Sequence, residues 1–173
     1  MGRKIVVTSG KGGVGKTTLT ASLGIAIAET GKKVVLVDAD IGLNNLDVVL
    51  AVENKVVYDV LDVISGKCRL KQALIQDVDN PTLYVLPSAK IQDSPLITAC
   101  SFRNVVDALA LNFDFVIIDC PAGIDNGFHR AVSAATEAIV VTTPHISAVR
   151  DADKVLSILS GYCLMSVGIV VNR

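Results

Sequence analysis

The chain has 173 residues, a length that suits one domain with a sizeable core. Apolar residues make up 51% of it and charged residues 19%, a balance that excludes a disordered chain and predicts a well-packed soluble protein. The formal net charge of −1 gives the chain no general attraction to nucleic acid, so we expect no nucleic-acid partner.

Short runs rich in β-branched residues alternate with longer helical patterns along the chain. We predict strands over residues 4–8, 33–38, 82–87, 113–119, 137–143 and 167–172. We predict helices over residues 16–30, 101–111, 125–135 and 147–160. Each strand is a nearly continuous apolar run, which is typical of parallel strands covered on both faces. The alternation predicts one α/β domain over residues 1–173, with a doubly wound, mostly parallel sheet between two layers of helices.

A glycine-rich segment joins the first predicted strand to the first predicted helix. Residues 10–17 read Gly-Lys-Gly-Gly-Val-Gly-Lys-Thr, which fits the phosphate-loop pattern G-x-x-x-x-G-K-[ST] in its strand–loop–helix context. Backbone N–H groups of such a loop surround phosphate oxygens, and the helix start adds about half a positive charge. We expect Lys16 to contact the β- and γ-phosphates of ATP and the Thr17 hydroxyl to bind Mg²⁺. The predicted nucleotide-binding residues of this segment are Lys11, Gly12, Gly13, Val14, Gly15, Lys16, Thr17 and Thr18.

A second motif overlaps the same segment. Gly10, Gly12 and Gly15 also fit the G-x-G-x-x-G fingerprint of dinucleotide-binding folds, and Asp38 stands where a ribose-binding acid would be expected. This alternative leaves the lysine and threonine at the helix start without a role. A cation and a hydroxyl at that position suit Mg²⁺-triphosphate better than pyrophosphate, so we favour the triphosphate interpretation.

Carboxylates follow two of the predicted strands, at the edge of the sheet where ligands bind in parallel folds. Asp38 and Asp40 end the second strand, and side-chain alternation predicts that both lie on one side of it. One would hold a Mg²⁺-bound water, and the other would orient the water that attacks the phosphate. Asp119 ends an apolar strand in the Walker B pattern and is a second predicted metal-site residue. The loop after it, with Pro121 and Gly123, is predicted to be a switch that orders with ATP.

The second lysine of the glycine-rich loop, Lys11, makes the segment similar to the deviant phosphate loop of the MinD/ParA family. Residues 40–47, 56–66 and 121–124 resemble the MinD branch of that family, and the resemblance spans essentially the whole chain. It implies that Lys11 reaches across a dimer interface to phosphates bound by the other subunit, as an arginine finger does. It also implies that Asp40 positions the attacking water.

Other site residues are implied by the same resemblance. The Asn-Arg pair at the end of the sequence resembles one whose asparagine, here Asn172, hydrogen-bonds adenine. Residues 147–153 resemble a helix start at the dimer and partner surface. The implied catalytic residues are Lys11, Lys16 and Asp40, and the implied switch and interface residues are Gly42, Asn45, Pro121, Gly123 and Asp151.

The resemblance implies a function in placing the division septum. The expected reaction is hydrolysis of ATP to ADP and phosphate, which times an ATP-dependent homodimer. The expected partners are a MinC-like division inhibitor and a MinE-like activator, and the ATP-bound form would lie at the inner face of the cell membrane. The family continues past this sequence to an amphipathic membrane-binding helix, which the 173 residues do not contain.

Two alternatives stay open. The first is an ATP-gated scaffold of the ParA or flagellar-number type with little turnover, because slow hydrolysis needs the same loop. The second is group transfer to a small molecule, as in biotin-pathway relatives. We do not expect electron transfer of the nitrogenase iron-protein type, because Cys100 and Cys120 lack an evident partner arrangement for a cluster, and no C-x-x-C pair suggests a zinc or redox motif. We expect Cys120 and Cys163, which stand in apolar surroundings, to be buried thiols, and we expect a cytoplasmic location because no secretory signal is present.

Overall fold

The computed structural model describes residues 1–42, 45–90 and 94–173. Within these residues, seven strands form one sheet in the order β3-β4-β2-β5-β1-β6-β7. The strands are β1 (Arg3–Thr8), β2 (Val34–Asp38), β3 (Ile75–Gln76), β4 (Leu83–Leu86), β5 (Phe115–Asp119), β6 (Glu137–Thr142) and β7 (Ser166–Val171). All neighbouring pairs are parallel except β3 with β4. The predicted doubly wound, mostly parallel fold is confirmed.

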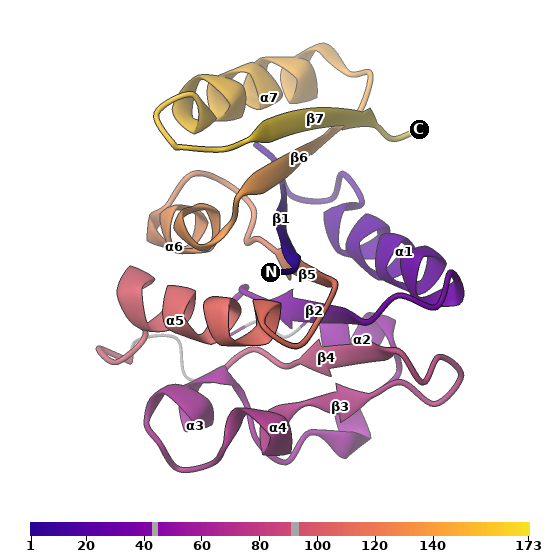
Figure 1. Ribbon diagram of the computed structural model, residues 1–173. Coiled ribbons are helices and arrows are strands. Elements are labelled where there is room, and N and C mark those ends of the chain that lie inside the picture. The colour runs from indigo at the N-terminus through magenta and orange to yellow at the C-terminus, as the bar shows by residue number, and fades with distance from the viewer. Residues whose placement is uncertain (43–44, 91–93) are drawn as a thin grey trace.

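Helices cover both faces of the sheet, as Figure 1 shows. They are α1 (Lys16–Glu29), α2 (Leu46–Val49), α3 (Val60–Ile64), α4 (Leu70–Ala73), α5 (Ala99–Ala110), α6 (Asn126–Ala134) and α7 (Ile146–Leu159), with a 3₁₀ turn η1 (Glu53–Lys55). Buried side chains of α1 and α2 pack in one cluster against the sheet, whereas those of α3 to α7 pack in a second cluster on the other face. The sheet therefore has an apolar layer on each side.

The central strands are buried because they lie between these two layers. The four residues from Val34 to Val37 have no exposed surface, and Phe102 and Phe128 are among the largest side chains that are fully buried. Strands covered on both faces place apolar side chains on successive residues, which explains the continuous apolar runs in the sequence.

The six predicted strands and four predicted helices are confirmed within two residues at each end. The sequence patterns missed β3, α2, α3, α4 and η1, which have at most five residues each and are too short to show a period. Cys120 is buried as expected, but the expectation for Cys163 was wrong because its thiol is exposed. Its neighbours Tyr162 and Leu164 take the apolar contacts instead.

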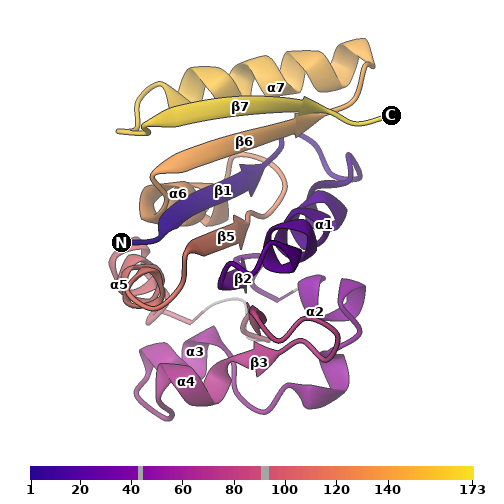
Figure 2. The same ribbon diagram turned by 45° about the vertical axis from the view of Figure 1, so that its right-hand side comes forward.

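The parallel arrangement brings the ends of three strands to one edge of the sheet. Val7 of β1 and Asp38 of β2 both lie in register with Asp119 of β5. The glycine-rich loop leaves β1 at this edge and leads into α1, on the right in Figure 2. The fold therefore places the loop beside two of the predicted acids.

Candidate functional site

The glycine-rich loop has a backbone that only glycine adopts readily, and it packs closely on its neighbours. Gly15 has φ +88°, and a Cβ on it would lie 2.4 Å from Asn172 Nδ2. That amide nitrogen donates a hydrogen bond of 2.9 Å to the carbonyl of Val14. A Cβ on Gly10 would lie 2.4 Å from the backbone oxygen of Asp151 in α7. Asn172, directly after β7, and Asp151 of α7 thus pack closely against the loop.

Helix α1 begins at Lys16, directly after the loop. Within the described chain it has neither a side-chain cap at Gly15 nor an acidic residue in its first turn. The first N–H groups of a helix lack partners inside the helix, and the helix dipole places partial positive charge there. The start of α1 is therefore suited to an anion such as a phosphate group.

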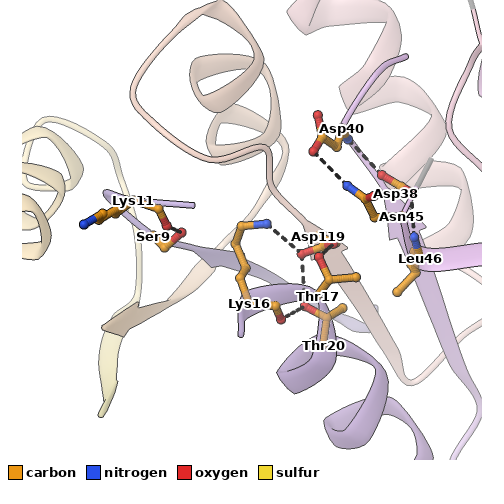
Figure 3. Close-up of polar contacts among 10 residues, drawn as sticks. All are labelled: Ser9, Lys11, Lys16, Thr17, Thr20, Asp38, Asp40, Asn45, Leu46 and Asp119. Atoms are coloured by element: carbon orange, nitrogen blue, oxygen red, sulfur yellow. Dashed lines mark hydrogen bonds and ion pairs between the residues drawn. The ribbon is translucent and has the colours of Figure 1, made fainter. Parts of the chain in front are cut away.

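A buried carboxylate lies beside this helix start (Figure 3). Asp119 Oδ1 accepts from Lys16 Nζ at 3.2 Å, and Oδ2 accepts from the Thr17 hydroxyl at 2.6 Å. The hydroxyl of Thr20 also donates to Oδ1, at 3.3 Å. Sequence reasoning missed Thr20, although its position four residues after Lys16 places both on one helix face. The lysine and the carboxylate are both buried, so water screens their attraction little.

The acids at the end of β2 lie in different surroundings (Figure 3). Strand β2 ends at Asp38, so the predicted alternation does not extend to Asp40. Asp38 is buried and accepts the backbone N–H groups of Asp40 at 2.9 Å and Leu46 at 3.1 Å. Burial raises the pKa of Asp38 to about 7, against the effect of these two hydrogen bonds. Asp38 therefore links the backbone at Asp40 to the backbone at Leu46, where α2 begins.

Asp40 is half-buried, and its Oδ2 lies 3.5 Å from Asn45 Nδ2. Burial raises the pKa of Asp40, and the nearby positive charge of Lys16 opposes this shift. Asp40 and Lys16 line one cavity, so this carboxylate, unlike that of Asp38, faces the space beside the loop.

The two lysines of the loop point in different directions (Figure 3). Lys16 points toward Asp119, whereas Lys11 is exposed and extends away from both. The Ser9 hydroxyl donates to the backbone carbonyl of Lys11 at 2.9 Å. Among the described residues, no carboxylate lies within 4.0 Å of the Lys11 ammonium group.

A cavity of about 660 Å³ lies over the loop. Its volume is within the range of small-molecule sites, roughly 300–1,000 Å³. Its lining includes predicted residues from the loop and from the segment after β2, and Ala122 of the predicted switch loop, together with Ser9, Val48 and Val49, which sequence reasoning missed. The lining residues are Ser9, Lys11, Gly12, Gly13, Gly15, Lys16, Thr17, Thr18, Asp40, Asn45, Val48, Val49 and Ala122.

The predicted switch and interface residues occupy several places. Gly42 has φ +94° and donates its N–H to the carbonyl of Ala89 at 2.9 Å. Gly123 donates to the carbonyl of Ser9 at 3.4 Å, while Pro121 lines an adjacent cavity that Asp40 shares. Leu43 and Asn44, which belong to the predicted first switch segment, lie outside the described residues. The Asp151 carboxylate accepts a hydrogen bond from Lys154 Nζ at 3.3 Å, and Asp151 is not among the residues that line the loop cavity.

Comparison with known proteins identifies the family. A family model described as an AAA domain matches residues 2–161. The septum site-determining protein MinD of Synechocystis is 51% identical over 173 residues, which cover 100% of this chain and 65% of that protein. A chain of the MinC:MinD cell division protein complex of Aquifex aeolicus is 44% identical, with a TM-score of 0.88, over 99% of this chain and 68% of that chain.

The chain belongs to the MinD family. The resemblance inferred from the loop is therefore confirmed. A structure of MinD from Pyrococcus horikoshii, complexed with Mg-ADP, has a TM-score of 0.89 and 38% identity over 100% of this chain and 71% of that chain. The chain spans less than two thirds of the length of the curated MinD relatives that it matches. Among its described helices, none has the length and apolar character needed to cross a bilayer.

Proposed function

We propose that this chain is the nucleotide-binding part of an ATPase that places the division septum. The observation that carries the proposal is the cluster of Lys16, Thr17 and Asp119 where the glycine-rich loop leads into α1. A buried cation, a hydroxyl and a carboxylate meet there beside an uncapped helix start. This is the set of groups that phosphoryl transfer requires for positioning a triphosphate and its metal ion.

The residues at the loop fit a Mg²⁺-nucleotide. Oxygen ligands are those that Mg²⁺ prefers, and Thr17 and Asp119 offer them 2.6 Å apart. Asp38 would act on the metal ion only indirectly, because both of its carboxylate oxygens accept backbone N–H groups. When bound, Mg²⁺ neutralises charge on the phosphate oxygens. The Mg-ADP bound by the Pyrococcus horikoshii relative supports this assignment.

The direction and the free hydrogen-bonding groups of three side chains support the remaining proposed roles. Asp40 faces the loop cavity with a raised pKa and would orient the attacking water. Asn172 still has an oxygen acceptor to offer adenine, since its hydrogen bond to the Val14 carbonyl uses the amide nitrogen. Lys11 points away from its own loop, so we assign it to the phosphates of a second subunit. A cation inserted in this way accelerates phosphoryl transfer by roughly 10³–10⁵.

The proposed cycle uses ATP as a timer. Two copies associate when both hold ATP, and hydrolysis separates them. The Aquifex aeolicus MinC:MinD complex supports a MinC-like inhibitor as the partner of the dimer. A MinE-like activator and binding to the inner face of the membrane complete the proposal for the whole protein. The proposed location is the cytoplasm, peripheral to that membrane when ATP is bound.

The mass of the chain in solution tests the dimer. Light scattering should give a monomer with Mg-ADP and a dimer with a non-hydrolysable Mg-ATP analogue. Lys11→Ala should bind both nucleotides with unchanged affinity but stay a monomer, while Lys55→Ala, which changes an exposed lysine on η1, should dimerise normally. A Lys11→Ala variant that still formed the dimer would refute the role of Lys11.

Phosphate release distinguishes the enzyme from an ATP-gated scaffold. We expect slow turnover of Mg-ATP that rises with protein concentration, because each active centre needs the partner's lysine. The Lys11→Ala variant should lose this rise. A dimer that forms with Mg-ATP and releases no phosphate, with or without vesicles and a MinE-like activator, would favour the scaffold.

A further inference from the structure

A second cavity lies at the opposite edge of the sheet from the glycine-rich loop. It has a volume of about 520 Å³ and lies between α4, α5 and the start of β4. Lys33 directly precedes β2, and Phe113 stands two residues before β5, so the cavity is at the end where the parallel strands begin. Helices α4 and α5 pack on the same face of the sheet, and Figure 1 shows both away from α1. A ligand there would not overlap a nucleotide at the loop.

The walls of this cavity are apolar and half-buried. Leu70 and Leu74 contribute from α4 and its end, and both pack against the core without being fully covered. Tyr84 and Phe113 form an edge-to-face pair with ring centroids 5.3 Å apart and an angle of 72° between the planes. Such a wall suits an aliphatic or aromatic body, and the volume is within the usual range for small ligands.

The rim of this cavity carries three exposed cations, Lys33, Arg69 and Lys71. In the described part of the chain, none of the three forms an ion pair within 4.0 Å, and no acidic residue lines the cavity. The carboxylate of Asp114 accepts the backbone N–H of Lys33 at 2.8 Å and lines a neighbouring hollow instead. In a chain with net charge −1, three cationic residues around one cavity, with no acidic residue in its lining, create a local positive potential.

We propose that this cavity binds a small amphipathic anion, namely a carboxylate attached to an aliphatic or aromatic body. The apolar walls would bury the body, and the guanidinium and ammonium groups of the rim would pair with the carboxylate. Arginine is well suited to the second task, since its planar group binds a carboxylate through two hydrogen bonds. The site is independent of the proposed ATPase function and places a second ligand at the far end of the sheet.

Decanoate is a suitable probe, with decanol as its uncharged counterpart. Titration calorimetry with the intact chain should give a Kd for decanoate of about 1 mM or tighter, the affinity expected for a ligand of this size. Decanol should bind at least about 10-fold more weakly. Saturating Mg-ATP should leave the Kd for decanoate unchanged. Absence of decanoate binding, equal affinity for decanol, or competition by Mg-ATP would each overturn the proposal.

Charge-reversal variants locate the binding. Arg69→Glu/Lys71→Glu should weaken decanoate binding about 10-fold or more, the effect of two lost ion pairs. Lys55→Glu/Lys154→Glu carries the same change in net charge on exposed residues elsewhere and should leave the Kd unchanged. Equal Kd values for the two double variants would overturn the proposal.

A variant that fills the cavity tests its location. Ala108→Phe should abolish decanoate binding while the thermal unfolding midpoint stays close to that of the parent, since Ala108 is only half-buried. Unchanged decanoate binding by this variant would contradict the site.

A capped Leu-Glu-Phe-Glu peptide tests whether the cavity binds a protein instead. If the peptide bound more tightly than decanoate, and lost affinity in the same variants, the cavity would be assigned to a protein partner and the small-ligand proposal would be overturned.

Discussion

Lys11 and Lys16 stand five residues apart, the first in the glycine-rich loop and the second at the start of α1, and they differ in burial and in ion pairing. Lys16 starts α1, is buried and pairs with Asp119 at 3.2 Å. Lys11 lies in the loop itself, is exposed and has no carboxylate within 4.0 Å in the described residues. The buried ammonium group is suited to a ligand held in its own subunit, and the exposed one to a ligand held elsewhere.

Replacing Lys16 tests its proposed contact with phosphate. Lys16→Ala should weaken Mg-ATP binding about 100-fold, the effect of one or two charge-assisted hydrogen bonds in a buried site. Titration with a fluorescent ATP analogue measures this directly, and Lys55→Ala should bind like the parent. Tight Mg-ATP binding by Lys16→Ala would refute the assigned role.

At the scale of elements, α1 is bounded by two glycines with left-handed backbones. Gly15 precedes the helix with φ +88° and is packed against Asn172, whereas Gly31 follows it with φ +81° and has open space around its Cα. Gly15 is favoured both because its φ is positive and because a Cβ there would clash with Asn172. Gly31 is favoured only because its φ is positive, so it serves as a control for Gly15.

Alanine variants of this pair separate backbone strain from packing. Both Gly15→Ala and Gly31→Ala should lower the free energy of unfolding by about 1 kcal/mol, because alanine disfavours positive φ. Only Gly15→Ala should also weaken nucleotide binding, since its Cβ would displace Asn172 and distort the loop. Urea unfolding and nucleotide titration measure the two effects. Equal nucleotide affinity in both variants would contradict the packing argument.

At the scale of the whole molecule, the sheet is held by contacts between residues far apart in sequence. Arg3 of β1 forms two hydrogen bonds, of 2.8 and 2.6 Å, with the carboxylate of Glu137 in β6. The Ser166 hydroxyl of β7 donates to the same carboxylate at 3.1 Å. These contacts join three neighbouring strands across 134 and 29 residues of sequence. The hydrogen bond from Arg3 lowers the pKa of Glu137, and the Ser166 hydroxyl adds to this shift.

The lowered pKa of Glu137 predicts a pH-dependent contribution to stability. The contribution is fully present above the ordinary glutamate pKa of about 4.3 and is lost as the pH falls through the lowered value. Because the Arg3 side chain is 57% exposed, water screens the pair and the contribution should be about 1 kcal/mol. Urea unfolding should show Glu137→Gln less stable than the parent by this amount at pH 7, with the difference shrinking as the pH falls below the ordinary glutamate pKa. A difference that persisted unchanged at pH 3 would contradict this explanation.

The fold and the loop were predictable because they depend on local patterns. A continuous apolar run predicts a buried parallel strand wherever it occurs, and the glycines, Lys16 and Thr17 form a phosphate loop through backbone geometry within eight residues. The short elements α2, α3, α4 and β3 were missed because so few residues show no period. Thr20 was missed although its helical spacing from Lys16 was visible in the sequence.

The sequence alone determined the layered architecture, the phosphate loop and the family, because each depends on residue types at fixed spacing. Tertiary structure alone decided that the carboxylate of Asp38 accepts two backbone N–H groups, while Asp40 faces the cavity. It also decided that the Asn172 amide donates to the carbonyl of Val14 in the loop, and that three cationic residues line one apolar cavity at the opposite edge of the sheet. The physical reason is that these contacts join separate elements, and their distances depend on how helices and strands pack against one another.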